Sequence, residues 1–248
     1  MITGQVIASA VAIGLVLLTF YWASITVETQ LQASEFTSAI YSFQILANFD
    51  DGAFKKGDVN YALLSISRGR IENKEYSFHL QIVIDYTLIY EEVFPTKIIS
   101  YRGGWLVSTP KNFYRGDANP VTNTSLTFVV YTDMEDGARV FLKPRIRVFP
   151  LGVYKGRKVG GEEYSIYMLN IYVPRIVIGE CYGTSPYHLI LRTNNTRVIT
   201  LEEKYDLTET HIVKIYVNDR EIDINTGPVD SIIITIIVSE IVFEVKGV

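Results

Sequence analysis

The first 27 residues of the chain carry no charged side chain, and the first charged residue is Glu28. A helix from Gln5 to Val27 would rise about 1.5 Å per residue and reach roughly 35 Å, enough to cross the ~30 Å hydrocarbon core of a bilayer. Tyr21 and Trp22 stand near its far end, where aromatic side chains favour the boundary between lipid and water. The segment therefore predicts a membrane-spanning helix.

Two other interpretations of this segment fit the residues less well. A cleavable secretion signal has a basic head, an apolar stretch of about 7–15 residues and small residues at its exit. Here the first basic residue of the chain is Lys55, the apolar run is longer, and bulky Tyr21 stands where a small residue is needed before Ser24. A buried helix of a soluble core would carry a polar face, which this segment lacks.

The helix is expected to continue beyond the membrane boundary, because neither Gly nor Pro occurs from Ile25 to Asp51. The apolar positions in this stretch recur at steps of four, three and four residues, which is the spacing of one helical face. They are Phe36, Ile40, Phe43 and Ala47. The opposite side is expected to carry the polar residues Thr29, Gln30, Gln32, Ser34, Glu35, Thr37, Ser38 and Gln44. Turn residues at Asn48–Gly52 would end a rod of about 66 Å that begins at Gln5.

The residues at the start of this helix resemble a known family. Gly4 is followed by Gln5 and then by VIASAVAIGLVLLTF, and this arrangement resembles the N-terminus of archaeal type IV pilin-like proteins. That family includes adhesive pilins, archaellins and accessory subunits of the archaellum. The resemblance covers about the first fifty residues and the layout of a helix followed by a β domain. It implies a leader of residues 1–4 that a peptidase removes by cutting between Gly4 and Gln5.

The chain departs from the usual family pattern at two places. No Lys or Arg precedes the expected cut, and Ser9 stands where bacterial pilins carry an acidic residue. The resemblance also implies that the apolar helices of neighbouring subunits bundle together, and small residues let helices approach closely. The residues expected in these helix contacts are Ala8, Ala10, Ala12, Gly14, Leu15 and Leu18. The alternative is a single-span anchor with a short stalk, which needs no packing face.

Residues 58–248 are expected to form an antiparallel β-sandwich, because strand-like runs alternate with turn signals and show no helical periodicity. Strict alternation over Phe78–Tyr90 predicts one long strand with a bend or bulge midway. Ser231–Val245 predicts a central strand, since this apolar run is too short and too polar for a second span. Further short strands are expected at Lys97–Tyr101, Trp105–Ser108, His188–Arg192 and Arg197–Leu201. Turns are expected at Asp117–Pro120, Met134–Gly137, Thr193–Asn195 and Ile224–Pro228. A division into two β subdomains near residues 117–120 also fits the pattern.

Composition argues against several functions. The net charge is −4 and no dense basic patch occurs, so nucleic acid is not an expected partner. The single cysteine, Cys181, allows no intrachain disulfide. The histidines His79, His188 and His211 are far apart and lack neighbours at metal-ligand spacing. We therefore expect no catalytic residue, no metal and no cofactor.

Two further clusters have simple interpretations. Asp133–Gly137 gathers three carboxylates but lacks the continuation of a calcium-binding loop, so it predicts a solvated hairpin tip. Tyr154–Gly161 is basic and rich in glycine but lacks the phosphate-binding pattern, so it predicts a basic hairpin. Asn123 and Asn194 begin N-glycosylation sequons, and both are expected in exposed loops.

With no catalytic constellation, the sequence predicts a function based on placement and assembly. The first hypothesis is a structural subunit of an archaeal type IV pilus-like extracellular filament, in which copies of the chain assemble through the N-terminal helix. The alternative is a single-span membrane-anchored envelope or archaellum accessory protein whose extracellular β domain binds the surface layer or another component. A third hypothesis is an anchored enzyme or carbohydrate-binding domain, although no residue cluster locates such a site.

Overall fold

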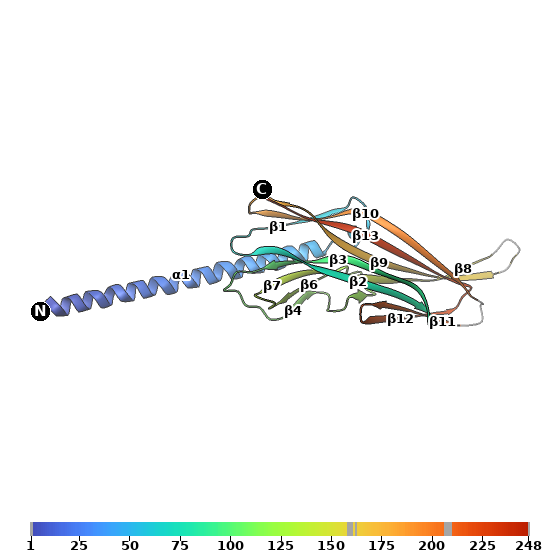
Figure 1. Ribbon diagram of the computed structural model, residues 1–248, viewed down its shortest axis with the longest axis horizontal. Coiled ribbons are helices and arrows are strands. Elements are labelled where there is room, and N and C mark those ends of the chain that lie inside the picture. Colours follow the sequence, from blue (N-terminus) through green and yellow to red (C-terminus); the bar gives the residue numbers. More distant parts are fainter. Residues whose placement is uncertain (1, 158–160, 162, 206–209, 248) are drawn as a thin grey trace.

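The computed structural model describes residues 2–157, 161, 163–205 and 210–247, with the backbone alone for residues 2–8. One long helix, α1 (Ile2–Ala47), runs into the β domain and projects far beyond it (Figure 1). The helix ends one residue before the expected Asn48, and a short 3-10 helix, η1 (Gly52–Phe54), follows. The prediction of one continuous helix is confirmed.

Two curled sheets make up the β domain, which confirms the predicted fold of a long helix followed by a β-sandwich (Figure 1). The six-stranded sheet has the order β1-β10-β13-β9-β8-β5. Its strands are β1 (Val59–Leu64), β5 (Val121–Thr122), β8 (Ile146–Arg157), β9 (Glu163–Tyr182), β10 (Tyr187–Lys204) and β13 (Ser231–Gly247). The seven-stranded sheet has the order β12-β11-β2-β3-β7-β6-β4. Its strands are β2 (Arg70–Ile84), β3 (Thr87–Arg102), β4 (Asn112–Arg115), β6 (Phe128–Asp133), β7 (Arg139–Pro144), β11 (Thr210–Val217) and β12 (Arg220–Pro228).

The sheets are mostly antiparallel, with two exceptions that the sequence pattern did not predict. Strand β13 pairs with β9 in parallel, and the short β5 pairs with β8 in parallel. The chain leaves the six-stranded sheet after β10, forms β11 and β12 in the other sheet, and returns as β13, so β13 can run in the same direction as β9. As expected, β13 is a central strand, with β10 on one side and β9 on the other.

The C-terminal half of α1 belongs to the core. Phe36, Ile40, Phe43 and Ala47 are all buried, which confirms the predicted helical face. They form one apolar cluster with side chains from both sheets, including Leu64 of β1 and Leu142 of β7. A second cluster, formed by β2 and β11 against β9 and β13, contains no helix residue. The helix therefore fills the space between the sheets at one end of the sandwich, whereas the sheets contact each other directly at the other end.

The long strand predicted at Phe78–Tyr90 is wrong, because the chain reverses there. Strand β2 ends at Ile84, and Asp85 and Tyr86 form a two-residue turn in which both have positive φ (46° and 70°). The turn pairs Thr87 with Ile84 and Leu88 with Val83, so Leu88 faces away from the core and is 51% exposed. A register shift then pairs Tyr90 with Ile82, so the sequence alternation resembles that of one strand only because the turn and the shift offset each other. Phe78 is fully buried in β2, whereas Tyr86 is 96% exposed at the tip of the hairpin.

Two predicted turns and one predicted strand are also wrong. Thr193–Asn195 forms a bulge inside β10, and Ile224–Pro228 lies inside β12, which shifts register against β11. Asn and Gly support bulges as readily as turns, so the local chemistry was ambiguous. In place of the expected strand at Trp105–Ser108, the chain forms a turn followed by irregular backbone. Each sheet contains strands from both sides of residues 117–120.

Candidate functional site: the apolar stem and its collar

The N-terminal half of α1 stands free of the β domain. We call residues 9–27 the stem; every side chain in it is exposed except that of Ile25, which is partly covered. Phe20 is 72% exposed and Trp22 is 63% exposed. The most apolar window of the helix has a mean hydropathy of 2.0, and none of it is buried. By length and composition this helix can cross a membrane, as a membrane anchor or a signal sequence does.

The predicted packing residues within the described side chains all lie on this free surface. Ala10, Ala12, Gly14, Leu15 and Leu18 are exposed, and a Cβ at Gly14 would meet no atom within 4 Å. Because an α-helix turns about 100° per residue, Ala10 and Gly14 share one side of the stem and Ala12 faces the other. Gly4, Gln5 and Ala8 lie in the helical backbone, and their side chains are outside the described residues.

Where α1 enters the domain, two loops contact one face of the helix. We call this region the collar; it consists of Gln32 and Glu35 of α1 with residues 67–69 and 103–106. The Glu35 carboxylate accepts hydrogen bonds from the backbone N–H groups of Ser67 (2.9 Å), Arg68 (3.2 Å) and Gly69 (2.9 Å). It also accepts one from the Tyr101 hydroxyl (2.5 Å). Glu35 therefore ties the helix to the start of β2 and to β3.

The second loop contacts the helix through Gln32. The Gln32 Oε1 atom accepts a hydrogen bond from the Leu106 backbone N–H (2.9 Å). Gly104 packs so closely on Gln32 that a Cβ at this position would collide with the Gln32 side chain. Gly103 packs on Phe36 and donates its N–H to the Ala138 carbonyl (2.9 Å). Only glycine allows the loop to approach the helix this closely.

The placement of Gln32 and Glu35 corrects the sequence prediction, which put both on the solvent side of the helix. Gln32 is fully buried and Glu35 is half-buried. Each precedes an apolar core residue by one helical turn, Phe36 and Ala39 respectively, so both are in phase with the buried face. This helical phase was the feature of the sequence that could have predicted their burial. Their polar side chains suggested exposure to solvent, but hydrogen-bond donors of the collar loops pair with these side chains instead.

Electrostatics at the collar favour the ionised carboxylates. Burial alone would raise the pKa of Glu35, but the hydrogen bonds from Tyr101, Gly69, Ser67 and Arg68 outweigh it and lower the pKa below its ordinary value. Burial, together with the adjacent Glu35, raises the pKa of Tyr101. Two turns from Glu35 toward the stem, Glu28 accepts a hydrogen bond from Arg68 (2.8 Å), and this contact lowers the pKa of Glu28.

No protein-family model, curated protein or solved structure matches this chain. The function is therefore argued from the stem and the contacts that fix it.

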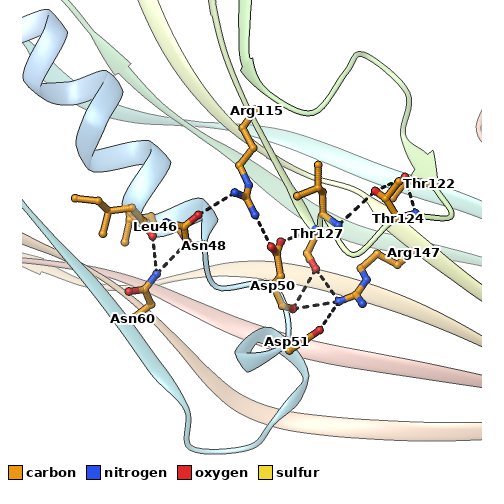
Figure 2. A network of polar contacts seen from close by, with 12 residues as sticks. Leu46, Asn48, Asp50, Asp51, Asn60, Arg115, Thr122, Thr124, Thr127 and Arg147 are labelled. Atoms are coloured by element: carbon orange, nitrogen blue, oxygen red, sulfur yellow. Dashed lines mark hydrogen bonds and ion pairs between the residues drawn. The ribbon is translucent and has the colours of Figure 1, made fainter.

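A second polar network fixes the other end of the helix (Figure 2). The Asp50 carboxylate accepts the Thr127 backbone N–H (2.7 Å) and forms an ion pair with Arg115. Arg115 also donates to the Asn48 side chain (2.8 Å) at the end of α1. Arg147 donates to Asp51 (3.0 Å). Together with the collar, this network holds α1 at both ends of its buried half.

The other predicted candidates lie apart from the stem. His79 contacts Glu91 (2.6 Å) on the domain surface, and His211 is buried against Asp85 (2.5 Å) at the β2–β3 turn. Among the described residues, no group of three or more His, Cys, Asp and Glu side chains is placed to hold a metal ion. Cys181 is exposed near the end of β9.

The predicted hairpin tip at Asp133–Gly137 is confirmed between β6 and β7, with positive φ at Asp136 and Gly137. Of the predicted basic hairpin, β8 extends to Arg157, and residues 158–160 lie outside the described residues.

The two sequons occupy different settings. Asn123 is exposed in the loop after β5, as predicted. Asn194 is exposed in the bulge of β10, not in a loop, and its side chain donates a hydrogen bond to Glu240 (2.9 Å).

Proposed function

We propose that this chain is a structural subunit of an archaeal type IV pilus-like extracellular filament. In this proposal the stem resides in the membrane before assembly and then packs against the stems of other copies, while the β domain faces outward. The observation that carries the proposal is the continuity of α1: one helix has a free apolar half and a half built into the domain core.

This continuity supports a filament more than a simple anchor because of rigidity. A domain that only needs retention at a membrane can hang from a flexible linker. In a helical polymer every subunit must present its stem to its neighbours in the same orientation. The collar and the Asp50 network fix the direction of the stem relative to the sheets, and no Gly or Pro lies between the stem and the core to act as a hinge.

The stem surface also supports contacts with several neighbours. Its small residues lie on opposite sides, with Ala10 and Gly14 on one and Ala12 on the other, so neighbouring helices could approach from both sides. The stem bears exposed Val, Leu, Ile and Phe side chains, and removing each from water is worth about 1.5–3 kcal/mol. That free energy disfavours release of single subunits into water.

A pair of substitutions in the stem tests the proposal against the anchor alternative. Gly14→Leu stays apolar, so lipid accommodates it, but it fills the space that close helix approach needs. Val16→Leu is the matched control, because Val16 is already large and exposed. Each variant would be expressed as the full chain in archaeal cells that carry a type IV pilus assembly system.

We expect electron microscopy of surface material to detect filaments with the wild type and with Val16→Leu, and few or none with Gly14→Leu. The unassembled chains of all three proteins should be found in the membrane fraction. Filaments absent from the wild type, with the intact chain retained in the membrane, would contradict the proposal and favour the anchor. N-terminal sequencing of filament material should begin at Gln5.

A further inference from the structure

The collar carries a large aromatic side chain that the described residues leave largely uncovered. Trp105 is 84% exposed. It occupies the corner of a turn that is closed by a hydrogen bond from the Val107 N–H to the Gly104 carbonyl (3.1 Å). A tryptophan side chain buries 150–250 Å² when it is covered, so leaving it in water forgoes substantial hydrophobic free energy.

The turn is held in place by the helix rather than free to move. Leu106, the next residue, donates its backbone N–H to Gln32 of α1 (2.9 Å), and Gly104 packs directly on the same side chain. Gly103 is bonded to Ala138 at the start of β7 (2.9 Å). These contacts fix Trp105 at the height of Gln32 along the helix.

That height coincides with the expected surface of a membrane. Glu28 is the first charged residue of the chain, so the hydrocarbon layer ends at or before it. Gln32 lies four residues farther along the helix, or about 6 Å. A bilayer of ~40–45 Å with a ~30 Å hydrocarbon core has about 5–7 Å of headgroup region on each side. The Trp105 turn thus lies at the outer edge of that region.

We propose that Trp105 inserts into the headgroup region of the membrane, where α1 leaves the lipid, and helps to set the depth of the chain in lipid. Trp and Tyr side chains favour this region because an apolar ring and a polar N–H or O–H are both satisfied there. The occupant of this surface is lipid, since the turn is continuous with the stem. This inference rests on the membrane residence of the stem that the proposed function includes.

The experiment uses the fact that the chain has only two tryptophans. Trp22→Phe leaves Trp105 as the sole tryptophan, and Trp105→Phe leaves Trp22. Each full-length variant is reconstituted in phosphatidylcholine nanodiscs that contain lipids brominated at shallow or at deep positions of the acyl chains, and tryptophan fluorescence is recorded. Bromine quenches only the tryptophans that approach it.

We expect the emission of Trp105 to be blue-shifted relative to tryptophan in water, and to be quenched more by shallow than by deep bromines. Trp22 should be quenched in the companion variant. Quenching of Trp22 with no quenching of Trp105 would overturn the inference and leave the membrane residence of the stem intact. Blue-shifted, unquenched emission from Trp105 would also overturn it, since a protein contact would then cover the ring. No quenching of either tryptophan would overturn both the inference and the membrane step of the proposed function.

Discussion

The Tyr101 hydroxyl of β3 donates a hydrogen bond to the Glu35 carboxylate of α1 across a 66-residue separation in sequence (2.5 Å). Tyr101 is fully buried, and Gly69 lies so close to its hydroxyl that a Cβ there would collide with it. The same carboxylate caps three backbone N–H groups at the start of β2. One side chain thus connects the helix to two strands at the point where the stem leaves the domain.

Replacing Glu35 by Gln should destabilise the β domain. Gln has one carbonyl oxygen and an NH₂ group, which cannot accept the donors that now face the second oxygen. We expect the free energy of unfolding to fall by about 1–3 kcal/mol. The loss should lie toward the low end of this range, because the exposed N–H groups of Ser67 and Arg68 can form hydrogen bonds with water instead. The control is Glu28→Gln, which weakens an exposed pair with Arg68 and should lose clearly less stability than Glu35→Gln. Thermal unfolding of the detergent-solubilised chain measures both, and equal losses would contradict the role of the collar.

The same carboxylate predicts an acid-dependent loss of stability. The pKa of Glu35 is lower in the folded chain than its ordinary value of 4.5, so the folded state binds fewer protons than the unfolded state near that pH. The stabilisation is therefore complete above about pH 5 and is lost as the pH falls through the folded pKa. Melting temperatures measured between about pH 7 and pH 3 should fall less steeply in Glu35→Gln than in the wild type. Parallel curves would show that another group controls the acid response.

The buried half of α1 should be essential to the sandwich. Phe43 is fully buried between the sheets, so Phe43→Ala should cost about 3–5 kcal/mol through lost burial and a cavity. Tyr41 lies on the opposite side of the same helix and is 62% exposed. Tyr41→Ala should change stability by less than about 0.5 kcal/mol. Denaturant unfolding compares the two, and a mild effect of Phe43→Ala would mean that the sheets fold without the helix.

The network in Figure 2 predicts that Asp50 and Asp51 are not equivalent. The Asp50 and Arg115 side chains are each 19% exposed, so Asp50→Ala leaves a partly buried guanidinium and the Thr127 N–H without a partner. We expect a loss of about 2–3 kcal/mol. Asp51 is 75% exposed, and Asp51→Ala should lose under about 1 kcal/mol. A urea titration that ranks Asp51 above Asp50 would refute this assignment.

The stem and the β domain should respond independently to substitution. Leu17 lies in the middle of the stem and contributes nothing to the domain core. Leu17→Arg should disfavour membrane insertion by about 2.5–3.5 kcal/mol, whereas Leu17→Ala should insert normally. Membrane fractionation measures insertion, and the melting temperature of the β domain in detergent should be unchanged by either variant. A lower melting temperature with Leu17→Arg would mean that the stem contacts the domain.

Local patterns in the sequence were sufficient for the features that depend on one element at a time. The uncharged run before Glu28 indicated a helix without a water-facing side, and the spacing of Phe36, Ile40, Phe43 and Ala47 indicated its buried face. The short apolar run at Ser231–Val245 likewise indicated a buried strand. Each of these patterns is a spacing of apolar residues within one element, and that spacing can be read directly from the sequence.

Only the tertiary structure decided which residues meet across the fold. Alternation alone could not separate a long strand from a hairpin at Asp85 and Tyr86, because the apolar residues continue at every second position although the pairing reverses the chain there. Residue type did not distinguish Gln32 and Glu35 from the solvent-facing polar residues Gln30 and Ser34, although their phase matched the buried face of the helix. Their burial depends on backbone donors supplied from far along the chain, at residues 67–69 and at Leu106. A polar side chain can be buried when groups far along the chain form hydrogen bonds with it, and the sequence alone does not identify those groups.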